Sequence, residues 1–213
     1  PYSLPRRWFD WPLDQVVKRC VDRWVVATGP AKAALVAVLG VLPEKVNVIA
    51  NGIPERIGTE SRAPARARLG IADARVALGN VAIFEERKGH GLLIEAMARL
   101  ARQRPPEKMP LLLIEGDGPG RDRLAVAADE RDVSAFIRFV GRETQIYNLL
   151  GACDGLVETS TGGSPSPNIV SEAMGLGMAV LGSVYSSTEQ ISSGKDGLLF
   201  DPRDSDAFAA ALG

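Results

Sequence analysis

The stretch from Ser160 to Leu181, STGGSPSPNIVSEAMGLGMAVL, holds the residues whose types and spacing best suit chemistry. A polar loop leads into a short helix, where Ser166 is placed to cap the first turn and Pro167 suits its start. The N–H groups from Asn168 to Val170 are then expected to be free at the positive end of the helix dipole, a seat for a phosphate. Glu172 lies one turn further and leans back toward that seat, within reach of sugar hydroxyls. The stretch therefore predicts a nucleotide site.

A second group of charged residues, EERKGH, runs from Glu85 to His90 between an expected strand and an expected helix. Lys88 supplies a mobile cation that can neutralise a diphosphate, and Gly89 allows a ligand to approach the backbone closely. A solvated charged turn is the alternative interpretation. His90 could serve as a general base, but a single histidine that opens a helix is more often a cap or a packing residue.

Two weaker motifs follow. The glycines of Gly116-Asp117-Gly118-Pro119-Gly120 could admit a ligand, or the segment could be a tight turn with Asp117 as a local hydrogen-bond acceptor. Asp204-Ser205-Asp206 resembles a D-x-D metal motif, but it introduces an apolar helix, so capping explains it better. No metal site is assigned, and no cofactor is expected.

The elements that must position these residues alternate between apolar strands and helices from Val76 onward. This alternation predicts an α/β fold with a doubly wound parallel sheet covered on both faces. The expected strands are Val76–Phe84, Leu111–Glu115, Phe136–Val140, Gly155–Glu158, Ala179–Gly182 and Leu198–Phe200. The expected helices are Gly91–Ala101, Arg121–Asp129, Gln145–Leu150, the Glu172 helix and Asp204–Leu212, with helical turns at Arg66–Leu69 and Thr188–Ser192. In such a sheet a ligand lies at the carboxyl ends of the strands.

The first part of the chain carries a smaller set of elements. A helix is expected at Leu13–Val21, a strand at Trp24–Ala27, a helix at Pro30–Leu39 and a strand at Val46–Ile49. Residues 58–65 have the composition of a linker. Before these elements, Arg6, Arg7, Trp8, Phe9 and Trp11 favour either contact with a membrane surface or packing against another part of the protein.

Composition excludes several classes of function. The formal net charge of −1 gives no general attraction for nucleic acid. No apolar segment approaches the roughly 20 residues of a spanning helix, and no signal-peptide pattern is present, so a cytoplasmic location is expected. Cys20 and Cys153 form no disulfide framework and are interpreted as buried free thiols.

Taken in order, the motifs resemble a known family. The blocks are VNVIANGI, NVAIF…RKGHGLLIEAM, LLLIEGDGPGRDRL, FIRFVG and PNIVSEAMGLGMAV. They are similar to the retaining glycosyltransferases of family four, which have the GT-B fold of two facing Rossmann-like domains. The resemblance implies that residues 1–50 end an acceptor-binding domain, that 51–75 form a linker and first helix, and that 76–213 form a donor-binding domain truncated at its C-terminus.

The resemblance also implies roles for individual residues. Lys88 matches the lysine that contacts the donor diphosphate, and Glu172 matches the second glutamate of an E-x7-E motif that holds the ribose hydroxyls. The backbone of Asn168, Ile169 and Val170 matches the phosphate seat. Gly116 and the Val140-Gly141 pair match loops near the donor and its base.

Two positions depart from the family pattern. Ser164 stands where the first glutamate of E-x7-E is expected, beside the donor sugar. Ala82-Ile83 replaces a Gly-Arg pair, so one diphosphate cation is missing, and Arg87 could partly substitute for it. These departures leave a non-catalytic nucleotide-binding module or partner subunit as an alternative to an enzyme.

The implied activity is transfer of a hexose-type sugar from a nucleotide-diphosphate sugar to an acceptor hydroxyl, with retention and without a metal. The implied partners are the nucleotide-sugar donor and a glycan or lipid-linked acceptor in polysaccharide or glycolipid synthesis, with peripheral contact at the inner face of the membrane. A nucleotide-sugar epimerase of the same fold is a weaker alternative. The 213-residue chain by itself is expected to be inactive.

Overall fold

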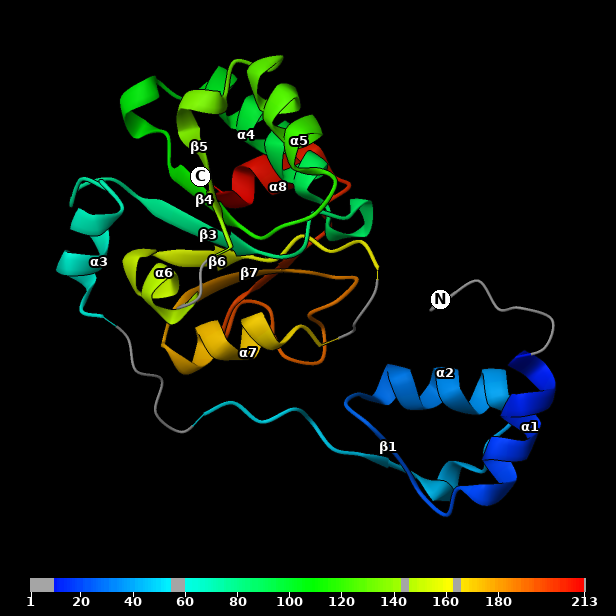
Figure 1. The fold of residues 1–213 in the computed structure, drawn as a ribbon. Coiled ribbons are helices and arrows are strands. Elements are labelled where there is room, and N and C mark those ends of the chain that lie inside the picture. Colours follow the sequence, from blue (N-terminus) through cyan, green and yellow to red (C-terminus); the bar gives the residue numbers. More distant parts are fainter. Residues whose placement is uncertain (1–9, 55–59, 143–145, 163–165, 213) are drawn as a thin grey trace.

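The computed structural model describes residues 10–54, 60–142, 146–162 and 166–212. The Arg6, Arg7, Trp8 and Phe9 cluster and Ser164 lie outside these ranges, so the expectations for them stay predictions. Figure 1 shows a small unit formed by the first elements and a larger unit built on a sheet.

The small unit consists of α1 (Asp10–Cys20), β1 (Trp24–Val26), α2 (Gly29–Leu39), a 3-10 turn (Pro43–Lys45) and β2 (Val46–Val48). The two strands pair in parallel, with Trp24 opposite Val46. Thr28 caps α2 by accepting a hydrogen bond from the N–H of Ala31 at 3.2 Å, and Gly40 ends the helix in the left-handed conformation. The prediction that both cysteines are buried is wrong for Cys20, which is exposed at the end of α1.

The larger unit is a six-stranded parallel sheet with the order β5-β4-β3-β6-β7-β8. Its strands are β3 (Ala77–Val81), β4 (Leu111–Glu115), β5 (Ile137–Gly141), β6 (Gly155–Val157), β7 (Ala179–Ser183) and β8 (Leu198–Phe200). The chain builds outward from β3 to one edge, then crosses back to β6 and builds to the other. This is the strand order of a doubly wound Rossmann-like sheet, as the sequence predicts.

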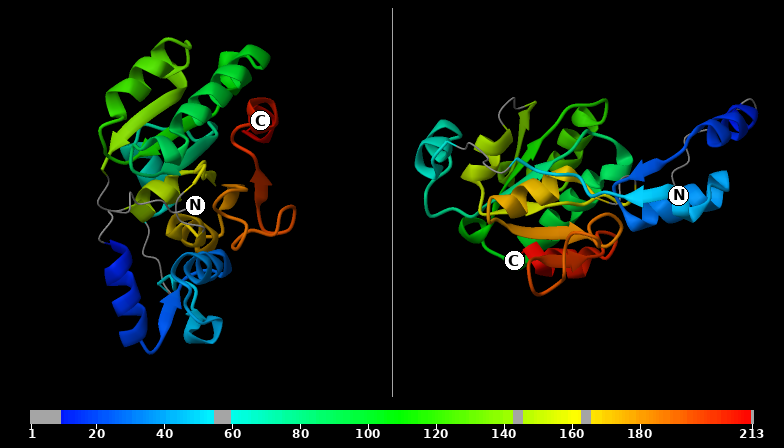
Figure 2. Two further views of the ribbon diagram at one scale, coloured as in Figure 1. Left: turned by 90° about the vertical axis from the view of Figure 1, so that its right-hand side faces the viewer. Right: turned by 90° about the horizontal axis from the view of Figure 1, so that it is seen from below.

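Helices cover both faces of the sheet (Figures 1 and 2). One face carries α4 (His90–Gln103), α5 (Arg121–Asp129) and α8 (Ser205–Leu212), and the other carries α3 (Arg62–Arg68), α6 (Ile146–Ala152) and α7 (Asn168–Gly175). Short 3-10 turns lie at Glu86–Lys88, Pro106–Lys108 and Ser134–Phe136. No helix in the described part of the chain has both the length and the apolar character needed to cross a bilayer.

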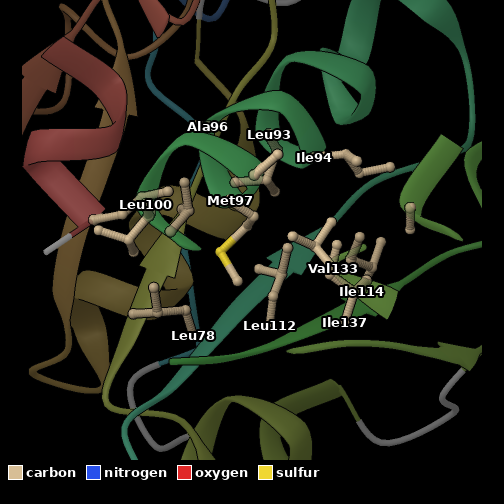
Figure 3. Packing of buried hydrophobic residues seen from close by; sticks show 14 of the residues in the cluster. Leu78, Leu93, Ile94, Ala96, Met97, Leu100, Leu112, Ile114, Val133 and Ile137 are labelled. Carbon is tan, nitrogen blue, oxygen red and sulfur yellow. The ribbon is translucent and has the colours of Figure 1, made fainter. Parts of the chain in front are cut away.

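Strand β4 shows how the sequence pattern builds the two-sided core, because all five of its residues are buried. Leu112 and Ile114 pack under α4, as Figure 3 shows, while Leu111 and Leu113 pack against α3 and α6. Successive strand side chains point to opposite faces, so a strand covered on both faces is apolar throughout.

Many elements differ from the expected bounds, and β3 and α3 are among those that differ most. Strand β3 ends at Val81 rather than Phe84, because the N–H groups of Ala82 and Phe84 donate to Glu115 and Asp117 and the chain follows the loop after β4. Helix α3 begins at Arg62, inside the segment expected to be a linker.

Arg66 of α3 is buried and donates to the carbonyls of Ala152 at 3.0 Å and Ala72 at 2.7 Å. These bonds connect α3 to the end of α6 and to the loop before β3.

Candidate functional site

The topological switch point between β3 and β6 brings together the loops that carry the predicted site. The hydroxyl of Thr159 donates to the carbonyl of Lys88 at 2.7 Å, and the N–H of Thr161 donates to the carbonyl of Arg87 at 2.8 Å. Lys88 and the loop that leads to α7 therefore lie together at the carboxyl ends of the strands, an edge called the rim below. Ligands of open α/β sheets bind in the crevice at such a point.

Lys88 is half-buried at the end of the 3-10 turn Glu86–Lys88. Burial lowers the pKa of Lys88, while the charge of Glu158 acts in the opposite direction. Its neighbour Arg87 is exposed and pairs with Glu85, with Nε and Oε2 2.6 Å apart. The two cations that the sequence places side by side thus have different surroundings in the structure.

Gly89 and Gly116 stand where loops approach too closely for any side chain. Gly89 has φ 72°, and a Cβ there would lie 2.1 Å from the carbonyl oxygen of Thr159. A Cβ on Gly116, with φ 148°, would lie 2.0 Å from the carbonyl oxygen of Ala82. Contacts between loops thus require glycine at both positions. Asp117 accepts from the N–H of Gly118 at 2.7 Å, so it is a local acceptor, one of the two interpretations of this motif.

Helix α7 begins at Asn168, and the residue before it, Pro167, makes no side-chain cap. The prediction that Ser166 caps this helix is therefore wrong, because the helix starts one residue later than that role requires. The N–H of Val170 donates to the carbonyl of Pro167 at 3.1 Å, so it is not free as expected. In the part of the chain that the structure describes, the N–H groups of Asn168 and Ile169 have no acceptor.

The side chains of Ile169 and Val170 belong to the core beneath α7, with Val170 fully buried. The start of the helix is further held by Gln190, whose side-chain amide donates to the carbonyl of Pro167 at 3.0 Å and to the hydroxyl of Ser171 at 2.6 Å. This packing orients the helix, so its first N–H groups face the rim without the help of a capping side chain.

Glu172 is half-buried one turn into α7 and acts on Tyr147 of α6. Burial raises the pKa of the Tyr147 hydroxyl, and the charge of Glu172 and a hydrogen bond with its side chain raise it further. Tyr147 is absent from the sequence-predicted site. Its place in the first turn of the helix that follows β5, beside the rim, is the signal that could have identified it.

Val140 and Gly141 end β5, which lies two strands from β3 in the sheet. The carbonyl of Gly141 accepts from the N–H of Gly116 at 3.1 Å, which joins the loops after β4 and β5. Among the described residues, a Cβ on Gly141 would meet nothing within 4 Å.

In the described residues, two hydrogen bonds join the small unit to the rim. The side-chain amide of Asn51 donates to Oδ1 of Asn168 at 2.8 Å, and the N–H of Gly29 donates to Oε2 of Glu189 at 3.1 Å. The first contact falls on the residue that begins α7. The predicted phosphate seat is thus next to a residue from the other unit.

His90 is 2% exposed and packs edge-on against Phe84, with ring centroids 5.1 Å apart. Burial lowers the pKa of its ring to about 4, and the charge of Lys88 adds to the effect. His90 also lines a cavity of about 550 Å³ on the α4 side of the turn, which Lys88 and Glu172 do not line. The packing interpretation of this histidine is therefore favoured over the general base.

Asp204, which precedes α8, has the capping role that the sequence favours for the acidic pair. Asp204 accepts from the N–H of Ala207 at 3.1 Å. Across the described ranges, no three histidine, cysteine or acidic side chains lie together as a metal site.

Solved structures with the same architecture define the class. HepE from Anabaena, crystallised with UDP and glucose, superposes with a TM-score of 0.82 over 96% of this chain and 57% of its own, at 24% identity. WaaG, a glycosyltransferase involved in lipopolysaccharide biosynthesis, gives a TM-score of 0.75 over 88% of this chain and 53% of its own, at 22% identity. The fold is that of GT-B glycosyltransferases.

Residues 75–213 match the family described as glycosyl transferases group 1, and the chain belongs to that family. Among curated relatives, the lipopolysaccharide core biosynthesis glycosyltransferase LpsE of Rhizobium meliloti (strain 1021) is 36% identical over 66% of this chain and 39% of its own length. LpsD of the same organism is 32% identical over 88% of this chain and 52% of its own length. The chain thus spans about half the length of these relatives or less.

Proposed function

We propose that the protein containing this chain is a retaining glycosyltransferase that moves a hexose-type sugar from a nucleotide-diphosphate sugar to an acceptor hydroxyl. The observation that carries the proposal is the switch point, where Lys88 and the loop leading to α7 are hydrogen-bonded to each other on one rim. Glu172 follows one turn into α7. Membership of the glycosyltransferase family supports the same assignment.

The chemistry follows from the charge of the leaving group. A nucleoside diphosphate gains negative charge as the sugar departs, so the site must stabilise that charge at fixed positions. Lys88 provides one cation, and the N–H groups of Asn168 and Ile169 provide oriented donors. Glu172 holds the ribose hydroxyls, and Tyr147 orients Glu172. The proposal needs no metal ion.

The acceptor and the pathway are also proposals. Two relatives are named for lipopolysaccharide core biosynthesis, which supports a glycan or lipid-linked acceptor and contact with a membrane surface. The structure of HepE holds UDP and glucose, so UDP is the first nucleotide to test. GDP and ADP complete the set.

Replacement of Lys88 by alanine tests the donor site. In the complete protein, the nucleotide that binds, whether UDP, GDP or ADP, is tested at 100 times its dissociation constant. It is expected to stabilise the fold by about 2.7 kcal/mol, measured by thermal unfolding. Lys88→Ala removes a charge-assisted hydrogen bond of about 1.5–3 kcal/mol, so turnover should fall about ten- to a hundredfold.

Lys195→Ala is the matched control, because this exposed lysine lies on a turn before β8, the strand at one edge of the sheet, whereas Lys88 lies at the central switch point. It should leave binding and turnover unchanged. Stabilisation by none of the three nucleotides, or full activity of the Lys88 variant, contradicts the proposal.

A second candidate is a module that binds the nucleotide without transfer. Ile83, at the position of the missing arginine, is 47% exposed beside the rim, and Arg87 pairs with Glu85. Lys88 then serves as the diphosphate cation without a second cation from these two positions. Turnover of a labelled panel of nucleotide sugars, compared between the complete protein and Glu172→Ala, separates the two, since binding without turnover favours the module.

A further inference from the structure

A buried carboxylate lies at the switch point beside Lys88. Glu158, the first residue after β6, is only 5% exposed. The hydroxyls of Ser186 and Ser187 both donate to its Oε2, the latter at 3.2 Å, and the N–H of Ser160 donates to Oε1 at 3.0 Å. A buried carboxylate is costly unless donors satisfy it, and these three donors do so.

The two serines are themselves held in place. The N–H groups of Ser186 and Ser187 donate to the carbonyl of Ser183 at 3.2 and 2.9 Å, so the chain turns tightly after β7. A Cβ on Gly182 would lie 2.7 Å from the Cβ of Ser187, so the strand leaves room for this turn only because that residue is glycine. The position of the Glu158 carboxylate is therefore dictated by the loop after β7.

The residue after Glu158 contacts the Lys88 turn directly. The hydroxyl of Thr159 donates to the carbonyl of Lys88 at 2.7 Å, and the carbonyl of Thr159 packs against Gly89 so closely that no Cβ fits. The loop after β7 is thus linked to the main chain of Lys88 by its hydrogen bonds to Glu158, by the peptide bond from Glu158 to Thr159, and by the hydrogen bond from Thr159.

Four charged or titratable groups act on Lys88 or are acted on by it. Glu158 and Glu85 favour its charged form, Arg87 opposes it, and His90, which packs against Phe84, is itself affected by Lys88. Glu85 is exposed and already pairs with Arg87. Among these groups in the described residues, Glu158 is therefore the buried carboxylate whose charge acts on Lys88.

We propose that Glu158 is a positioning residue for Lys88, which holds the ammonium charged and the turn in place through the Ser186–Ser187 loop and Thr159. The consequence of this positioning for donor binding rests on the proposed function. A carboxylate at this place compensates for the burial of Lys88, so that a single diphosphate cation remains protonated in a partly desolvated rim.

The first experiment needs no ligand. The six lysines of the chain are reductively methylated with ¹³C, the Lys88 resonance is identified by its loss in Lys88→Arg, and its pKa is measured by NMR. Glu158→Gln keeps the side-chain shape but removes the charge, so the pKa of Lys88 should fall. Glu85→Gln is the matched control and should lower it less. An unchanged Lys88 pKa in Glu158→Gln overturns the proposal.

Where Glu158→Gln does not fold, Glu158→Asp carries the test. The shorter side chain draws the carboxylate away from Lys88 with the charge kept, so a smaller fall in the same pKa is expected. No fall in this variant overturns the proposal.

The second experiment measures UDP affinity in the complete protein. Glu158→Gln should weaken binding about tenfold at alkaline pH, with recovery as the pH falls and Lys88 regains its proton. A uniform loss at all pH values indicates a structural role and contradicts the proposal. If wild-type protein binds no nucleotide while the Lys88 pKa still responds to Glu158, the positioning inference stands and the proposed function fails.

Discussion

At the scale of single residues, His90 makes the stability of the fold depend on pH. The pKa of its ring is about 4 in the folded protein, against about 6.5 in an unfolded chain. Because the unfolded chain binds the proton more readily, stability is expected to fall as the pH drops below about 6.5, with the loss complete near the folded pKa.

The loss should reach at most about 3 kcal/mol. His90→Phe preserves a ring against Phe84 but cannot be protonated. Urea unfolding near neutral pH and near pH 5 should therefore show a smaller decrease in the variant than in the wild type. Carboxylates contribute equally to both proteins, so equal decreases contradict this role of His90.

At the scale of elements, Gly116 joins the loops after β3 and β4. An alanine there would place its Cβ 2.0 Å from the carbonyl oxygen of Ala82, in a backbone conformation with φ 148° that L-residues avoid. Gly116→Ala is expected to destabilise the protein by about 2–4 kcal/mol in chemical unfolding.

Gly91→Ala is the control for this prediction. Gly91 is exposed in the first turn of α4, and a Cβ there meets nothing within 4 Å. The stability of the Gly91→Ala variant should be unchanged or slightly raised, because alanine favours helix. Similar losses for both variants contradict the packing explanation.

At the scale of the whole molecule, the two units differ in how far their apolar side chains are buried. All residues of β4 are buried, whereas the described part of the small unit exposes several large apolar side chains. Those exposed are Val16, Val17, Val25, Val38, Leu42, Val48 and Ile49. Amide hydrogen exchange in the isolated chain should be at least about a hundredfold faster in β1 and β2 than in β3 and β4.

The same measurement on the complete protein tests the proposed acceptor-domain boundary. If residues 1–50 end a larger domain, β1 and β2 should become protected there. Unchanged fast exchange in the complete protein contradicts that boundary.

Much of the fold could be predicted because its signals are local. The bounds of β4, β8 and α5 agree with those expected from sequence, since apolar runs and flanking glycines mark them. Expected bounds fail where loops interact. β3 ends early because its next residues bond to the loop after β4, and α7 starts without the Ser166 cap because Gln190 and the core hold it instead.

The residues of the candidate site likewise differ in whether a local sequence motif marks them. Lys88 and Glu172 could be identified because their motifs are short and continuous in the chain. Tyr147 and Glu158 belong to no such motif, and the role of each depends on a partner in another segment: Glu172 for Tyr147, and the serines after β7 for Glu158. The sequence predicts Glu158 only as the end of a strand.

The sequence by itself determined the alternation of elements, the parallel sheet covered on both faces and the chemistry available at the carboxyl ends of its strands, because hydrophobic period and turn residues act locally. Only the tertiary structure decided which strand ends lie side by side. It placed β3 beside β6, so that residues as distant as Lys88 and Thr159 share a hydrogen bond. Such a contact depends on strand order and on the packing of the entire sheet, which no short stretch of sequence encodes.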